Sequence, residues 1–125
     1  MSTATQAIQT AATPDQLPDM PLDPASIKEG NPVAKGTIIA QTADKKVSCG
    51  QWSCEPGKFE WTFIWDECVQ LLEGEVDVTD IATGQTVTLR AGDMASFPLG
   101  MKTVWHVKQK VRKFFTVRTP EPLEL

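Results

Sequence analysis

The sequence contains little histidine and cysteine, two common sources of metal ligands and nucleophiles. Its 125 residues include one histidine, His106, and three cysteines, Cys49, Cys54 and Cys68. An odd number of cysteines in a chain without an export signal argues against a disulfide framework, so we expect free thiols. A closed zinc site needs four ligands and would have to use all of these side chains. We therefore expect no structural zinc.

Long apolar runs and an export signal are also missing. No segment approaches the roughly 18 consecutive apolar residues that indicate a membrane span. The first residues, MSTATQAIQTAATPDQ, lack the basic start and the apolar centre of a secretory signal. The sequence therefore predicts a cytoplasmic location and no membrane partner.

Positive charge is in deficit as well. The chain has 12 Lys and Arg against 16 Asp and Glu, which gives a formal net charge of -4. Because nucleic-acid binding needs a basic patch, we do not expect a nucleic-acid partner. The one dense basic stretch, residues 108–118, has strand character, so we expect its charges to form solvated faces and ion pairs.

The chain has the length of one compact domain, and its composition divides it into three parts. Residues 1–29 are rich in proline and show almost no apolar periodicity, which predicts an extended N-terminal arm. Such an arm must lie on its own domain or on a partner subunit, and we expect it to reach across a neighbour. Residues 30–120 are expected to form the domain, and residues 121–125 a C-terminal tail.

Short runs of β-branched and aromatic residues, separated by turn-forming residues, follow from Pro32 onward. Val76 and Val78 alternate with polar residues, and so do Val87 and Leu89 beyond a Thr-Gly-Gln turn, which predicts a β-hairpin. Several short strands at near-regular spacing predict an antiparallel sandwich or a small barrel.

Two motifs carry a resemblance to a known family. The first has Glu67, six residues and Gly74, and the second has Gly92, five residues and Pro98-Leu99-Gly100. Both resemble the motifs of the cupin superfamily, in which glycines mark sharp turns between strands. The order WSCEPGKFEW, DECVQLLEGEVDVTD, AGDMASFPLGMKTVW and VRKFF is similar to small single-domain cupins of the (S)-ureidoglycine aminohydrolase cupin-domain type. The resemblance implies an all-β, RmlC-like cupin jelly-roll barrel of two antiparallel sheets.

The resemblance also implies a divalent metal held by three histidines and the motif glutamate. Only Glu67 matches this set. Depending on loop length, the two histidine positions of the first motif are Trp61 and Phe63 or Glu60 and Thr62. The histidine position of the second motif is Thr103. Aromatic rings are not ligands for these metals. We therefore predict no His-bound metal, and a site built from Glu67 with Gln70, Thr103 or a cysteine is the minor alternative.

Strand alternation predicts which side chains enter the barrel. If Glu67 points inward, Cys68 points outward, and if Thr103 points inward, so does Trp105, while His106 points away. Glu67 is the candidate catalytic acid or base, with a structural role in a hydrogen bond or ion pair as the alternative. Trp61, Phe63 and Trp105 line a pocket or fill the core. One of Arg112 and Lys113 faces inward as a salt-bridge partner or a ligand clamp.

Cys54 and Cys68 are the only candidate thiol nucleophiles near these motifs. No Cys-His pair is indicated because the single histidine is predicted to point outward. We therefore expect both to be buried, inert thiols.

These residues lead to two functional hypotheses. In the first, the barrel binds or acts on a small polar carbon–nitrogen compound, a ureide or an amino-acid derivative, with the compound class implied by the resemblance. Glu67 would then act without a metal. In the second, the chain is a non-catalytic cupin, a ligand sensor or an interaction protein, with its barrel filled by rings. Apolar residues on both faces of VQLLEGEV predict a homodimer in either case.

Overall fold

The structure is a computed structural model that describes residues 7–11 and 16–125. Residues 1–6 and 12–15 of the expected arm lie outside the described residues. The described chain forms these elements in order: 3-10 helix η1 (Pro24–Ser26), β1 (Ile27–Gly30), β2 (Ala34–Gln41), β3 (Val47–Cys54), β4 (Gly57–Thr62), β5 (Asp66–Asp80), β6 (Thr86–Arg90), β7 (Met94–Phe97) and β8 (Lys102–Arg118). This confirms the predicted all-β fold.

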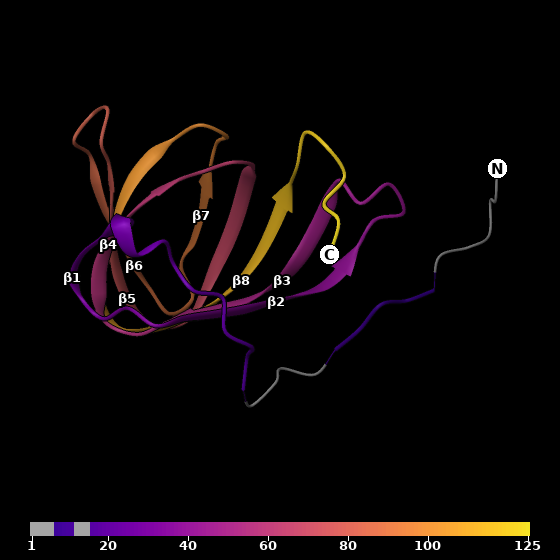
Figure 1. Ribbon diagram of the computed structural model, residues 1–125, viewed down its shortest axis with the longest axis horizontal. Coiled ribbons are helices and arrows are strands. Elements are labelled where there is room, and N and C mark those ends of the chain that lie inside the picture. Colours follow the sequence, from indigo (N-terminus) through magenta and orange to yellow (C-terminus); the bar gives the residue numbers. More distant parts are fainter. Residues whose placement is uncertain (1–6, 12–15) are drawn as a thin grey trace.

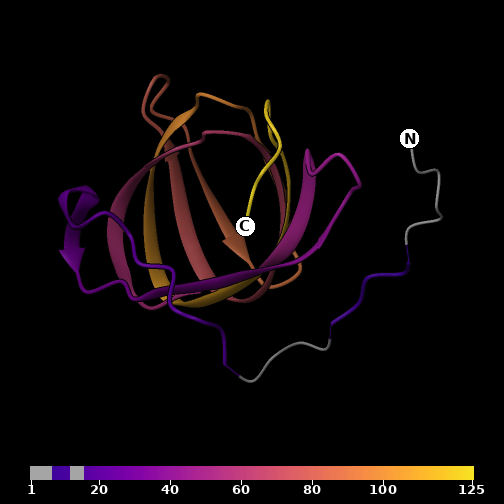
Figure 2. The ribbon, with the colours of Figure 1, turned by 45° about the vertical axis from the view of Figure 1, so that its right-hand side comes forward.

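The long strands β5 and β8 organise the barrel. The first half of β8 pairs with β4, its second half pairs with β3, and β5 runs antiparallel to it along both halves. Strands β2 and β1 flank this sheet as partners of β3 and β4, while β6 and β7 pair with β5. Figures 1 and 2 show how the strands curve around a common interior.

Gly74 allows β5 to follow β8 around the barrel. It lies inside β5, where the register shifts repeatedly between Leu71 and Val76. Its φ is 88°, and a Cβ atom there would come within 2.1 Å of the Lys110 carbonyl oxygen. The expectation that this motif glycine turns the chain between two strands was therefore wrong, since it bends a single continuous strand instead.

The predicted β-hairpin is confirmed. Val76 pairs with Leu89 and Val78 pairs with Val87 across β5 and β6. Val76, Val78 and Leu89 are buried in the core, whereas Val87 near the hairpin end is 37% exposed. The alternating apolar residues therefore point to the inside of the barrel along most of this hairpin.

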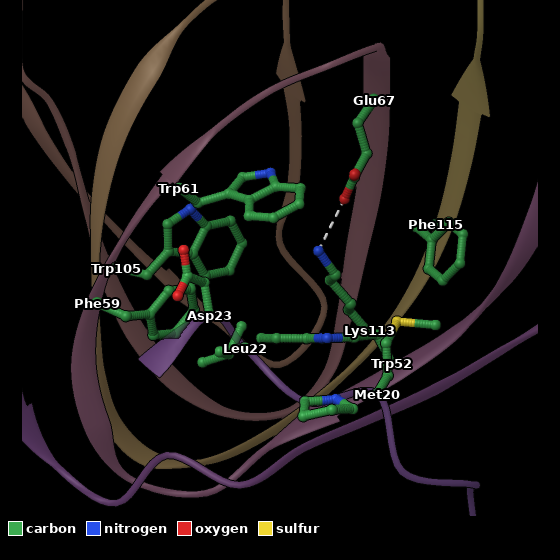
Figure 3. A pocket seen from close by; sticks show the side chains of 11 residues that line it. Met20, Leu22, Asp23, Trp52, Phe59, Trp61, Glu67, Trp105, Lys113 and Phe115 are labelled. Atoms are coloured by element: carbon green, nitrogen blue, oxygen red, sulfur yellow. Dashed lines mark hydrogen bonds and ion pairs between the residues drawn. The ribbon is translucent and has the colours of Figure 1, made fainter. Parts of the chain in front are cut away.

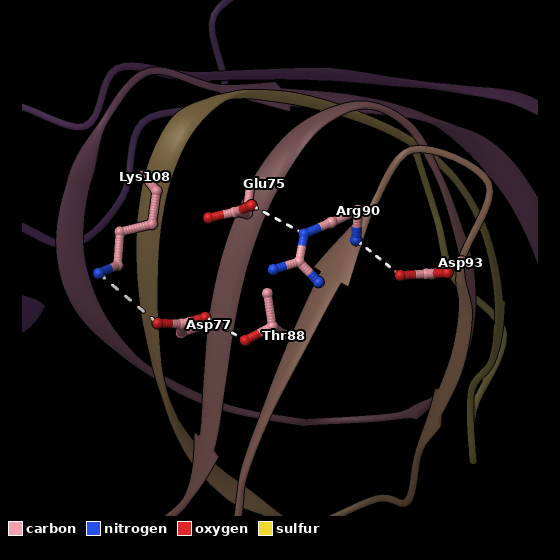
Figure 4. Close-up of polar contacts among 6 residues, drawn as sticks. All are labelled: Glu75, Asp77, Thr88, Arg90, Asp93 and Lys108. Atoms are coloured by element: carbon pink, nitrogen blue, oxygen red, sulfur yellow. Dashed lines mark hydrogen bonds and ion pairs between the residues drawn. The ribbon is translucent and has the colours of Figure 1, made fainter.

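The opposite face of the hairpin is polar and is connected to β8 through Lys108, as Figure 4 shows. Four contacts connect it: Arg90 Nε to Glu75 Oε1 at 3.0 Å, Thr88 Oγ1 to Asp77 Oδ1 at 2.6 Å, Lys108 Nζ to Asp77 Oδ2 at 3.6 Å, and the Arg90 amide to Asp93 Oδ2 at 2.8 Å. Lys110 and Arg118 also form exposed ion pairs, with Glu55 and Asp66. The basic stretch thus forms surface ion pairs at these positions, as predicted.

The N-terminal segment lies along the free edge of β2. The Gly36 amide donates to the Pro18 carbonyl oxygen at 2.9 Å, and the Met20 amide donates to the Ala34 carbonyl oxygen at 3.0 Å. Leu17 is buried, and the Gln9 side chain forms two hydrogen bonds with the backbone of Gln41. These parts of the arm therefore lie on their own barrel, and contact with a neighbouring subunit stays a prediction.

No helical segment within residues 7–11 and 16–125 has the length and apolarity needed to cross a membrane.

Candidate functional site

A cavity of about 170 Å³ opens inside the barrel. Figure 3 shows the side chains around it. The strands provide Trp52 from β3, Phe59 and Trp61 from β4, Glu67 from β5, and Trp105, Lys113 and Phe115 from β8, while the N-terminal segment contributes Met20, Pro21, Leu22 and Asp23. The cavity is therefore mostly apolar, with five aromatic side chains, and two acids and one lysine are its charged groups.

Glu67 and Lys113 form an ion pair at the cavity wall. Oε2 of Glu67 lies 2.7 Å from Nζ of Lys113, and the two residues are only 5% and 7% exposed. Oε1 of Glu67 accepts a hydrogen bond from Nε1 of Trp65 at 2.8 Å. Desolvation of buried charges is costly, and here it is offset by their mutual attraction and by the hydrogen bond from Trp65.

Two indole rings surround the Lys113 ammonium. Its Nζ atom lies 4.6 Å from the ring centroid of Trp52 and 4.7 Å from that of Trp105. The faces of indole rings attract cations, and this attraction grows where water is excluded. The ammonium is thus held by one carboxylate and two aromatic faces, which fixes its position at the cavity.

Thr103 orients the aromatic wall without lining the cavity. Its hydroxyl donates to the Trp61 carbonyl oxygen at 2.7 Å and accepts from Nε1 of Trp105 at 3.1 Å. Thr103 is buried and lies opposite Trp61 in the pairing of β4 with β8. The side chain at this motif position therefore positions two tryptophans.

The structure brings four of the predicted site residues to the cavity: Trp61, Glu67, Trp105 and Lys113. Phe63 lies elsewhere in the core, stacked on Phe97 with ring centroids 4.7 Å apart. Of the two basic candidates, Lys113 faces inward, whereas Arg112 hydrogen-bonds Gln51 on the outer side of the sheet. Lys113 is therefore the one of the two that enters the barrel.

Several cavity residues were missed by the sequence reasoning. Phe59 belongs to the same alternating aromatic run as Trp61, so strand parity could have included it. Trp52 and Phe115 depend on the pairing of β3 with β8, which no local pattern reveals. Residues 20–23 belong to the proline-rich segment, which has no apolar periodicity from which an inward-facing side chain could be predicted.

The cysteines differ in their surroundings. Burial, followed by the nearby Glu55 carboxylate, raises the pKa of the Cys54 thiol to about 12, so this group is a neutral thiol at physiological pH. Cys68 is exposed on the outer face of β5, and the expectation that it is buried was wrong. Alternation explains its position because it follows the inward-facing Glu67 directly.

The residues do not fit the metal centre that the cupin resemblance implies. Among residues 7–11 and 16–125, no three His, Cys, Asp or Glu side chains gather in a way that could hold a metal ion. Glu67, the one family ligand position that is retained, is paired with an ammonium and an indole N–H. Transition metals require several converging donor atoms, which these side chains do not supply.

The fold resembles solved structures of other proteins. A putative ethanolamine utilization protein Q from Salmonella typhimurium is 25% identical and has a TM-score of 0.62, over 74% of this chain and 72% of that one. A protein of unknown function of the DUF861 family from Pseudomonas syringae is 23% identical with a TM-score of 0.74, over 82% of this chain but only 44% of that one. A DUF861-family protein from Thermotoga maritima is 34% identical with a TM-score of 0.50, over 52% and 73% of the two chains.

No curated protein matches the sequence. The model of the EutQ-like cupin domain matches residues 41–115, which is more than half of the chain and includes both motifs. This match and the barrel confirm the predicted cupin superfamily and its jelly-roll fold. The chain belongs to the EutQ-like cupin domain family.

Proposed function

We propose that the barrel binds a small polar carbon–nitrogen compound, a ureide or an amino-acid derivative, without a His-bound metal. The observation that carries this proposal is the buried Glu67–Lys113 pair, which lies at the wall of an aromatic cavity. Other ion pairs of the described chain, such as Lys28–Glu60 and Arg118–Asp66, lie at the surface. An apolar cavity with a few polar groups converging on it is the usual composition of a ligand site.

The pair presents an acceptor and a donor side by side. A carboxylate has about four lone-pair positions, and an ammonium has three N–H groups. Glu67 accepts from Trp65 and Lys113, which leaves lone pairs for a ligand N–H, while Lys113 retains donors for a ligand oxygen. Amide and ureido groups carry both complementary functions, and flat groups of this kind also stack on indole rings.

The cavity limits the size of the ligand. Its volume of about 170 Å³ is well below the roughly 300 Å³ at which pockets for drug-sized molecules begin. A compound of a few non-hydrogen atoms would therefore fill it. The resemblance to ureidoglycine aminohydrolase cupin domains is the basis for naming ureides first among such compounds.

Catalysis by Glu67 would require it to exchange a proton with the ligand. Both of its oxygen atoms are already engaged, by Lys113 and by Trp65. This observation favours the second candidate function, a non-catalytic cupin that senses a ligand or acts as an interaction protein. If Glu67 is catalytic, a water molecule would add to the carbonyl carbon of a bound amide or ureide and the C–N bond would break with release of ammonia. If the cupin is non-catalytic, the compound would be recovered unchanged.

A thermal-shift screen tests the proposal. Ureides, amino acids, small amides and divalent metals are added to the purified protein, because a ligand that binds the folded state raises its apparent stability. A hit should be lost in Trp61→Ala and retained in Glu60→Gln, whose side chain lies on the opposite face and pairs with Lys28. If none of these compounds raises the melting temperature at millimolar concentration, the proposal is wrong.

The predicted homodimer and the cytoplasmic location stay predictions. Leu72, Met94 and Phe114 are at least 39% exposed. Gln70 of β5 pairs with Met94 of β7 on one side and with Phe114 of β8 on the other, so the three side chains share the outward face. Sedimentation of the purified protein would show whether a second copy is present.

A further inference from the structure

We propose that the Lys113 ammonium is the permanent cation of this barrel, in the role that a bound metal ion has in metal-dependent cupins, and that it binds an uncharged carbonyl oxygen of the ligand. The part of this inference that concerns the ligand rests on the proposed function. The part that concerns the cation rests on the contacts of Lys113 alone.

The Lys113 ammonium lies at the carboxylate of the motif glutamate. Glu67 is the motif residue whose carboxylate would contact a metal, and its Oε2 atom contacts Nζ of Lys113 at 2.7 Å instead. The described side chains offer no set of three metal ligands around it. A metal ion and the ammonium would compete for the same carboxylate, so the lysine both supplies a positive charge and excludes a second one.

The neighbours of Lys113 hold its charge in place. Trp52 and Trp105 flank the ammonium at 4.6 and 4.7 Å, and the hydroxyl of Thr103 fixes the indole of Trp105. A surface lysine samples many rotamers, whereas this one is confined by buried partners on several sides. A preorganised positive charge of this kind stabilises negative charge on a bound oxygen without having to reorganise.

The charges around the cavity restrict the charge of the ligand. Glu67 already neutralises Lys113, and Asp23, which is exposed and accepts a hydrogen bond from the Ala25 amide, adds a second carboxylate on the solvent side of the cavity. An anionic ligand would therefore face two carboxylates and a single ammonium. A neutral carbonyl group accepts the hydrogen bond without bringing a further charge into the barrel, where uncompensated charge is costly. Amides, ureas and ketones belong to this class, and carboxylates do not.

A binding experiment compares acetamide and N-methylurea, which are neutral, with acetate. Binding is followed by the fluorescence of the cavity tryptophans, and the variants are Lys113→Met and the control Lys110→Met, a surface lysine on the same strand that pairs with Glu55. We expect the two neutral probes to bind more tightly than acetate. Lys113→Met should weaken them by roughly 10- to 100-fold, the range for a lost hydrogen bond to a charged group.

A rescue experiment tests the role of the Lys113 cation without a ligand. In Lys113→Ala the missing atoms correspond to n-propylammonium, and 1-propanol has the same shape without the charge. We expect n-propylammonium to raise the melting temperature of Lys113→Ala by several degrees, more than 1-propanol does, and to leave the wild-type protein unchanged. If Lys113→Ala does not fold, Lys113→Met, whose longer side chain leaves no room for n-propylammonium, still tests the inference through the binding experiment.

The outcomes separate the two proposals. Rescue by n-propylammonium, with no binding of a probe and no hit in the thermal-shift screen, would refute the proposed function and support Lys113 as the cation of the barrel. A probe that binds equally well to wild type and Lys113→Met, or acetate binding more tightly than acetamide, would refute the inference and leave the proposed function standing. Equal rescue by both propyl compounds, or a stoichiometric transition metal that is lost in Glu67→Ala, would also overturn it.

Discussion

Nζ of Lys113 lies 2.7 Å from Oε2 of Glu67, and neither side chain has an appreciable contact with solvent. Replacement of one partner leaves the other charge buried without its counter-ion. We expect Glu67→Gln and Lys113→Met each to reduce the free energy of unfolding by about 3–5 kcal/mol, as measured by chemical denaturation.

The double variant Glu67→Gln/Lys113→Met is expected to lose less stability than the sum of the two single variants, because it leaves no unpaired charge. Glu60→Gln is the matched control. Its ion pair with Lys28 is about half exposed, and surface pairs contribute about 0–1 kcal/mol. Additive losses in the double variant would show that the two charges are not coupled.

A second prediction concerns the bend in β5. In Gly74→Ala the new Cβ atom would lie 2.1 Å from the Lys110 carbonyl oxygen, so β5 has to separate from β8 or distort. Gly84 has a similar φ of 76° but no atom within 4 Å of such a Cβ. We expect Gly84→Ala to cost about 1–2 kcal/mol from backbone strain alone, and Gly74→Ala to cost clearly more in the same denaturation experiment. Equal losses would mean that the close approach to Lys110 is unimportant.

A third prediction distinguishes a residue that stabilises the core from one that lines the cavity. Phe63 is buried against Phe97 and lies outside the cavity, so Phe63→Ala should lower the free energy of unfolding by about 3–5 kcal/mol. Trp61 is only half-buried and lines the cavity, so Trp61→Ala should chiefly weaken the binding of the probe amide. Stability by denaturation and binding by calorimetry measure the two effects. The reverse pattern would place the ligand elsewhere in the barrel.

Much of this arrangement follows from the two-residue period of a strand. Alternation places Glu67 inward and Cys68 outward, and it puts Thr103 and Trp105 on one face of β8. The same rule cannot assign Phe63, because β4 ends at Thr62 and the chain leaves the strand before this ring. The choice between Arg112 and Lys113 depends on the register of β8 against β3 and β5, which is set by long-range pairing and by the shifts around Gly74.

A fourth prediction concerns thiol reactivity. The pKa of Cys54 is raised to about 12 by burial and by Glu55, while Cys68 is exposed. In the native protein at about pH 8, iodoacetamide should therefore modify Cys68 and leave Cys54 unmodified, since the thiolate is the reactive form. Mass spectrometry of the digested protein identifies the labelled residues, and guanidinium-unfolded protein is the control. Equal labelling of both thiols in the native state would contradict the burial of Cys54.

A fifth prediction follows from Asp66. The Leu99 amide, which donates to its carboxylate, and then Arg118 hold the pKa of Asp66 below its ordinary value. A depressed folded-state pKa contributes stability above the unfolded value of 3.8 and loses it as the pH falls through the folded value. The difference in melting temperature between wild type and Asp66→Asn should therefore shrink below about pH 4. A difference that is constant over this range would rule out a pH-dependent contribution from Asp66.

The walls of the cavity come from opposite ends of the chain. Met20–Asp23 lie near its beginning, and Lys113 and Phe115 lie in its last strand. Contacts between residues so distant in sequence form late and slow the folding of β proteins. A chain still emerging from the ribosome therefore has no complete site until β8 has docked between β3 and β5. Tryptophan fluorescence from the barrel would consequently report the completion of the site during folding as well as the arrival of a ligand.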